Sequence, residues 1–181
     1  MNIIVIPDTS MIVIPLIEKN GHTYLSPTDF SRYDNMDICD GNLTFDNLIT
    51  RYSSTELPSG VKSRLFLFSK VIDKADAAII IGKRPNNYKK LYSPLNELIL
   101  FGANACNNAH GLLVKIVNDL DIPTLRLAFP TTQSEIISLI DKTNYFLKNL
   151  ESIEEIGVDL RPKKEKCPVF EVKKILNNNN F

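Results

Sequence analysis

Two short runs of mainly apolar, β-branched residues stand out along the chain, at positions 2–6 and 77–82. Polar residues scarcely interrupt them, and each is about as long as a β-strand. Continuous apolar runs of this kind are typical of central parallel strands, which are buried on both faces. Two shorter strand patterns, at 22–25 and 124–128, would extend the same sheet.

Apolar residues at helical spacing lie between and after these strands. The predicted helices cover residues 11–19, 61–73, 95–120 and 135–150. Asn20 and Gly21 form a stop signal for the first helix, and Ser59 is the expected N-cap of the second. Pro15 leaves two alternatives, a helix that starts late with Pro15 in its first turn or a helix kinked there. The segment 95–120 is one long helix or two, because Gly102 and Gly111 lie inside it.

Strands and helices thus alternate, which predicts an α/β protein. The expected architecture is a three-layer sandwich around a mostly parallel sheet of four to five strands, Rossmann-like or flavodoxin-like. Residues 1–150 would form one domain with an irregular insert at 27–58, and a loop of that length usually has a function. Residues 151–181 break the alternation and are expected to form an extension that packs on the domain or trails from it.

Charge and cysteine content exclude several classes of function. Lys plus Arg equals Asp plus Glu, 21 against 21, so neither nucleic acid nor a membrane surface is an expected partner. The first residues lack the basic region of a secretory signal, and no apolar stretch reaches the ~18 residues of a spanning helix. Three widely spaced cysteines without a C-x-x-C pattern argue against disulfides and zinc. We therefore expect a cytoplasmic protein without a metal, and no cofactor is indicated.

Three predicted strands lead into polar loops, where open parallel sheets bind ligands. Two of these loops precede helices, whose exposed amides favour anions. The expected ligand is an anionic, phosphorylated or carboxylated small molecule, and the candidate binding residues are Asp8, Thr9, Ser10, Lys83, Arg84, Thr131 and Thr132. The alternative is ordinary N-capping by the threonines beside a solvated basic loop. Neither glycine-rich nucleotide motif is present, so nothing points to a nucleotide specifically.

Cys106 and His110 are four residues apart and would share one face of a helix. A thiol beside an imidazole can act as an activated nucleophile, or the two groups can supply two ligands to a soft metal. The alternative is structural, because small residues such as those at 103–109 usually mark close packing against a helix or a subunit. In that case 95–101 and 103–109 would form the seam of a homodimer.

Short motifs at both ends of the predicted domain resemble the methanogenesis marker protein five family of methanogenic archaea. They are Pro7-Asp8-Thr9-Ser10, the helix end at 16–22, the strand at 122–127 and the turn at 130–132. The resemblance leaves 27–58 and the residues beyond 151 unplaced. It implies a cytoplasmic archaeal protein with a role tied to methanogenesis, and it supplies no catalytic residues.

The segment 74–81 is similar to a strand entry of nucleoside deoxyribosyltransferase-like enzymes, and Glu97 stands roughly where their nucleophile does. The chain departs from that pattern, because Glu97 lies too far before the next strand and the paired Asp is not evident after Gly82. The leading hypothesis is therefore an anion-binding or accessory protein of archaeal methanogenesis or cofactor metabolism. The rival hypotheses are a transferase or hydrolase, with Glu97 or Cys106 and His110 at its centre, and a homodimeric interaction protein.

Overall fold

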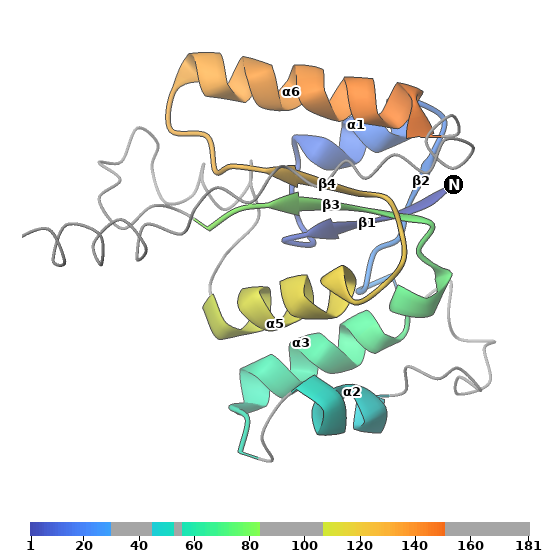
Figure 1. Cartoon of the computed structure of the whole chain (residues 1–181), viewed down its shortest axis with the longest axis vertical. Helices are drawn as coiled ribbons and strands as arrows, with labels where there is room; N and C mark the ends of the chain where they lie inside the picture. Colours follow the sequence, from blue (N-terminus) through green and yellow to red (C-terminus); the bar gives the residue numbers. More distant parts are fainter. Residues whose placement is uncertain (30–44, 53–55, 84–106, 151–181) are drawn as a thin grey trace, which may run out of the picture.

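The structure is a computed structural model that describes residues 1–29, 45–52, 56–83 and 107–150. These residues form three layers around a parallel sheet of four strands (Figure 1). The strands are β1 (Asn2–Ile6), β2 (Thr23–Tyr24), β3 (Ala77–Ile81) and β4 (Thr124–Leu127). Their order is β2-β1-β3-β4, which is the order of the first four strands in flavodoxin-like sheets. The predicted α/β class is confirmed.

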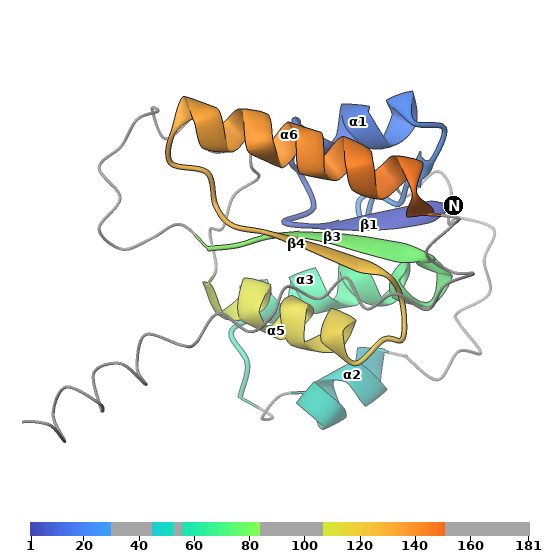
Figure 2. The same cartoon turned by 45° about the horizontal axis from the view of Figure 1, so that its top comes forward.

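Helices cover both faces of the sheet. On one face α1 (Val13–Lys19) lies beside α6 (Gln133–Lys148), as Figure 2 shows. The opposite face carries α3 (Ser59–Ser69) and α5 (Asn107–Asn118), and α2 (Phe45–Tyr52) packs on the outside of these two. A short 3-10 helix, η2 (Ile72–Lys74), leads into β3. None of the helices in the described part of the chain is long and apolar enough to cross a membrane.

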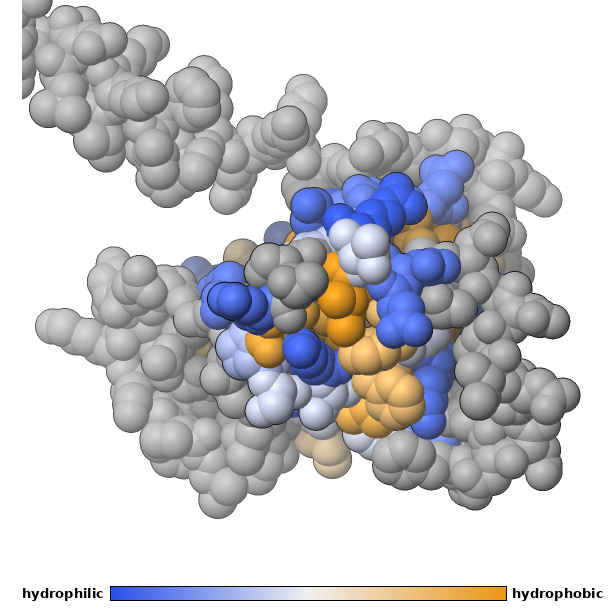
Figure 3. Space-filling view, turned by 90° about the horizontal axis from the view of Figure 1, so that it is seen from below, coloured by the Kyte–Doolittle hydropathy of each residue, from blue (hydrophilic) through white to orange (hydrophobic). Residues whose placement is uncertain are grey.

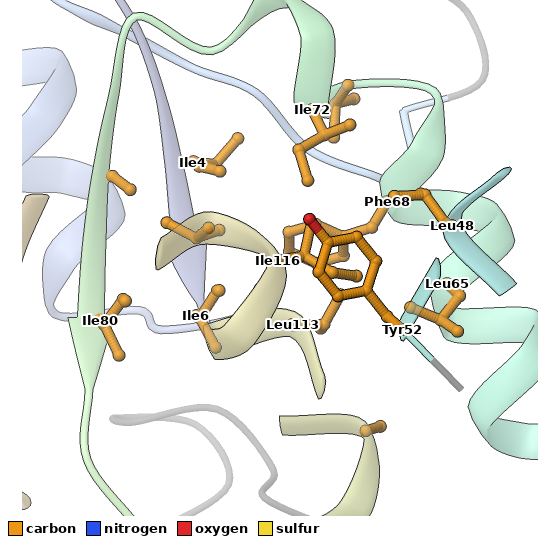
Figure 4. Packing of buried hydrophobic residues seen from close by; sticks show 14 of the residues in the cluster. Ile4, Ile6, Leu48, Tyr52, Leu65, Phe68, Ile72, Ile80, Leu113 and Ile116 are labelled. Atoms are coloured by element: carbon orange, nitrogen blue, oxygen red, sulfur yellow. The ribbon is translucent and has the colours of Figure 1, made fainter. Parts of the chain in front are cut away.

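The core is divided by the sheet into two apolar clusters. Ile3 and Val5 of β1 face α1 and α6, whereas Ile4 and Ile6 face the other three helices. Figure 4 shows the second cluster, in which Phe68 and Ile116 pack toward the sheet. All five residues of β3 are buried. Burial on both faces explains why the strand patterns contain apolar residues without alternation.

The outer side of α2, α3 and α5 also carries apolar groups. Seen from this side, apolar side chains gather in the middle of the face with polar ones around them (Figure 3). Phe66 of α3 is 46% exposed, and its ring meets that of Phe45 edge to face at 5.5 Å between centroids. Lys70 places its ammonium 4.8 Å from the centre of the Phe66 ring. The ring contact attaches α2 to α3, whereas Lys70 covers Phe66 from the end of the same helix.

The ends of the first two helices decide between the expected alternatives. Helix α1 starts at Val13, so Pro15 stands in its first turn and no kink is needed. Gly21 follows the helix with φ +82°, as the stop signal predicts. The expectation that Ser59 is an N-cap is wrong. Pro58 holds that position, because its carbonyl accepts the amides of Val61 and Lys62 at 2.9 and 3.1 Å.

Helix α2 was not predicted, because it lies in the segment expected to be an irregular insert. Leu48 and Tyr52, one turn apart, are buried against the core. Phe45 and Ile49 complete an i, i+3, i+4, i+7 apolar pattern with this pair, and that pattern is the sequence signal that was missed. The expected helix over 95–120 is described from Asn107 onward, and the tail 151–181 lies outside the described residues.

Candidate functional site

The strand order creates a topological switch point. β1 lies between β2 and β3, and the chain leaves β1 toward α1 on one face. The next described helix after β3 is α5, which lies on the opposite face. Chain segments that diverge in this way leave polar backbone and side chains at the carboxyl ends of the two strands, where open α/β sheets bind ligands. We call residues 7–10 and 82–83, at these two strand ends, the switch point.

At the end of β1, the loop is fixed by a buried carboxylate. Asp8 is only 6% exposed, and its carboxylate accepts a hydrogen bond from the guanidinium of Arg64 in α3. The hydroxyl of Tyr24 donates to the backbone carbonyl of Asp8. Ser10 is buried, whereas Thr9 between them is exposed. A guanidinium has five N–H donors, so Arg64 retains donors beyond the one that Asp8 takes.

At the end of β3, a glycine allows two strands to approach closely. The amide of Gly82 donates to the carbonyl of Leu127 at 2.7 Å. A Cβ at Gly82 would stand 3.3 Å from that carbonyl oxygen and 3.5 Å from the amide nitrogen of Phe129. Both neighbours are backbone atoms that cannot rotate away. The glycine therefore holds β3 tightly against the chain that leaves β4.

Lys83 follows and reaches the amino-terminal part of α5. Its Nζ lies 3.5 Å from where a Cβ at Gly111 would stand. The first turn of α5 contains no acidic residue. The amino end of a helix already carries a partial positive charge, so a lysine ammonium beside it is unfavourable unless an anion joins them.

His110 lies in the same part of α5. Its Nε2 is 2.9 Å from the carbonyl oxygen of Ile81, the last residue of β3, and the side chain is buried. Its Nδ1 is buried and has no hydrogen-bond partner among the described residues. Burial lowers the pKa of His110 below its ordinary 6.5; the hydrogen bond to Ile81 opposes this effect, and the charge of Lys83 adds to it. The ring is therefore neutral at neutral pH.

The amino end of α6 differs from that of α5. Thr132 caps the helix by accepting the Glu135 amide at 3.3 Å, and the Glu135 carboxylate accepts the amides of Thr131 and Thr132 at 2.6 and 3.2 Å. The Thr131 hydroxyl donates to the same carboxylate at 2.8 Å. Hydrogen bonds from Thr131, first its amide and then its hydroxyl, lower the pKa of Glu135. The chain's own carboxylate thus occupies this helix end.

Comparison with known proteins places the chain in a family. Residues 1–150 match the family described as an uncharacterized protein conserved in archaea, DUF2112. The chain belongs to the DUF2112 family. A relative is an uncharacterized protein of Methanocaldococcus jannaschii, 31% identical over 159 residues, which covers 84% of this chain and 97% of that protein. No solved structure matches the chain.

Membership of the DUF2112 family confirms the expected archaeal context, while the resemblance to methanogenesis marker protein five stays a prediction. Of the candidate site residues, Arg84, Glu97 and Cys106 lie outside the described residues. So does the proposed dimer seam, apart from Asn107, Asn108 and Ala109. Asp8, Thr9, Ser10 and Lys83 lie at the ends of β1 and β3, His110 lies in α5, and Thr131 and Thr132 lie at the amino end of α6. Their functional roles stay predictions.

Arg64 was missed by the sequence analysis of this DUF2112 protein. It lies within the helix predicted at 61–73, but no local motif marks it, because its partner Asp8 is 56 residues away. The sequence pointed to such a partner only indirectly, through Asp8. A carboxylate directly after a buried strand needs a cation or several donors, and only three-dimensional proximity can show which cation supplies them.

Proposed function

We propose that this protein binds a small anionic ligand, phosphorylated or carboxylated, between Lys83 and the amino end of α5 at the switch point. The observation that carries the proposal is the ammonium of Lys83, which lies against Gly111, the fifth residue of α5, a helix with no acid in its first turn. Two positive groups placed together favour an anion between them. In the same chain α6 meets this need with Glu135. The first turns of α1 and α3 also lack an acid, but α5 is the helix beside which the Lys83 ammonium lies.

Gly111 supports this assignment. Glycine in a helix interior costs about 0.5–1 kcal/mol relative to alanine. Gly111 is exposed, and the Nζ of Lys83 is the one described atom within 4 Å of its missing Cβ. Packing against the protein therefore does not require a glycine here. A bare helix surface beside an ammonium is what the close approach of a ligand requires.

Arg64 adds a second cation at the switch point, on the β1 side. Its side chain is 34% exposed although it is paired with Asp8. The pair holds the guanidinium in one orientation, and its remaining N–H groups can donate to an anion. Thr9, exposed in the same loop, offers a hydroxyl. The ligand would thus be held by Lys83 and α5 on one side and by the β1 loop on the other.

The cellular setting is the cytoplasm of methanogenic archaea, in methanogenesis or cofactor metabolism. The relative from the methanogen Methanocaldococcus jannaschii and the resemblance to the marker family support this setting. Small phosphorylated and carboxylated compounds are the common substrates and cofactors of such metabolism. The site chemistry and the setting are therefore compatible.

The test is a titration of the isotope-labelled protein with inorganic phosphate, followed by the amide resonances. We expect saturable shifts in residues 82–83 and 108–112, and at least a roughly tenfold weaker affinity in Lys83→Gln. Lys115→Gln is the matched control, because it removes the same charge from the far end of α5 and should leave the affinity unchanged. Equal effects of both substitutions, or shifts confined to other elements, would refute the proposal.

A further inference from the structure

We infer that the imidazole of His110 accepts a hydrogen bond from the ligand, so that the site selects anions carrying an O–H or N–H donor beside the charged oxygens. The inference rests on the proposed function and specifies its ligand class. It requires three things of His110: a fixed tautomer, an acceptor without a partner, and a place beside the anion.

The tautomer follows from the contact with β3. A backbone carbonyl can only accept, so the nitrogen that lies 2.9 Å from the Ile81 oxygen must carry the proton. A neutral imidazole has one protonated nitrogen. Nε2 is therefore the donor, and Nδ1 presents a lone pair.

The lone pair has no partner among the described residues, and His110 is only 7% exposed. Buried acceptors in folded proteins nearly always have a donor, and one that lacks a donor calls for an explanation. Protonation of Nδ1 is disfavoured here, because burial and the Lys83 ammonium both oppose a second positive charge. A donor from outside the described chain is the remaining way to satisfy the atom.

The position of the ring ties that donor to the anion. His110 immediately precedes Gly111, the residue against which the Lys83 ammonium lies. The Lys83 charge also acts on the His110 ring, so an anion bound at that ammonium would lie near the ring. Hydrogenphosphate and hydroxycarboxylates combine anionic oxygens with an O–H, and they satisfy cation and acceptor together. Sulfate has no proton to donate and would meet the lone pair with repulsion.

The experiment compares inorganic phosphate with sulfate, by calorimetry at mildly alkaline pH where the imidazole is neutral. The wild-type protein should bind phosphate about tenfold more tightly than sulfate, the value of one hydrogen bond to an ionic partner. His110→Gln keeps an amide N–H that can reach the Ile81 carbonyl but lacks an acceptor where Nδ1 stood, so the two affinities should become equal. His110→Asn places an amide oxygen near the Nδ1 position and should retain part of the preference.

The outcomes separate the two proposals. If the wild-type protein binds neither anion, the proposed function fails, and this inference fails with it. If it binds both equally, the inference is overturned while the proposed function stands. A preference for phosphate that persists unchanged in a folded His110→Gln variant would also overturn the inference, because another group would then be the acceptor.

Discussion

Arg64 of α3 and Asp8 at the end of β1 form an ion pair in which the two partners differ sharply in exposure. The Asp8 side chain is 5% exposed and the Arg64 side chain 34%. Asp8 is thus almost removed from water, whereas the guanidinium keeps a solvated side. The energetic consequence is asymmetric, because the loss of one partner is costly only when the other stays buried and charged.

Removal of Arg64 should therefore destabilise the protein more than neutralisation of Asp8. We expect Arg64→Ala to lower the free energy of unfolding by about 1–2 kcal/mol, at the lower end for such pairs because solvent screens the exposed side. Asp8→Asn leaves an amide that can still accept from Arg64, and it should cost less. The double variant should be no less stable than Arg64→Ala alone. Urea denaturation followed by circular dichroism measures all three.

The comparison needs a control for helix propensity and charge. Lys62→Ala makes a similar change two positions earlier on α3 and should alter stability by less than about 0.5 kcal/mol. Equal losses in Lys62→Ala and Arg64→Ala would show that the ion pair adds nothing to stability.

The stability of the protein should fall as the pH drops below 6.5, because of His110. Its pKa is below 6.5 in the folded protein, chiefly through burial, and close to 6.5 in the unfolded chain. Between these two values the unfolded state binds more protons, so the free energy of unfolding rises with pH. The stabilisation is complete above 6.5 and is lost as the pH falls toward the folded pKa. Urea midpoints measured at a series of pH values through this window test it.

Substitution of each histidine assigns the effect. The chain has two histidines, and both place Nε2 near a backbone carbonyl, His22 at 3.0 Å from Leu147 and His110 at 2.9 Å from Ile81. His110→Gln should flatten this part of the pH dependence, and His22→Gln should leave it in place. A pH dependence that disappears with His22 instead would contradict the assignment.

The sequence was most informative where one cause acts along a short stretch. Burial on both faces produces the apolar runs of β1 and β3, and capping chemistry marks Thr132 and Gly21, so these features could be predicted. Strand order could not be predicted. It depends on which side of β1 the later strands join, and no local pattern carries that information.

The site was only partly predictable for the same reason. Lys83 stands at a strand end and could be chosen by position alone. The pairing of Asp8 with Arg64 joins residues 56 positions apart, and the approach of Lys83 to Gly111 depends on where α5 packs. His110 was noticed for its spacing from Cys106, whereas its distinguishing feature in the structure is the contact with Ile81.

Two glycines should respond to alanine in opposite ways. Gly111→Ala should raise the free energy of unfolding by about 0.5–1 kcal/mol, because the new methyl would meet only the flexible end of Lys83. Gly82→Ala should lower it by about 1–3 kcal/mol, because its methyl would press on the backbone of Leu127 and Phe129. Thermal and urea unfolding measure both.

The same substitution at Gly111 also probes binding. Its methyl would cover the helix surface beside Lys83, so Gly111→Ala should weaken phosphate binding while stabilising the fold. Gly60→Ala is the matched control, since Gly60 lies in α3 with no neighbouring atom within 4 Å of its missing Cβ. It should stabilise the protein without any change in affinity. Unchanged phosphate binding in Gly111→Ala would argue against a ligand lying on this part of α5.

The capping box of α6 should matter for stability and not for anion binding. Thr132→Ala removes the hydroxyl that accepts the Glu135 amide and should cost about 1 kcal/mol of unfolding free energy. The amides of Thr131 and Thr132 would still be held by the Glu135 carboxylate, so phosphate affinity should equal that of the wild-type protein. Calorimetry on both proteins under one set of conditions measures this. A large loss of affinity in Thr132→Ala would move the anion site from α5 to the start of α6, because only a ligand held at that helix end would respond to its cap.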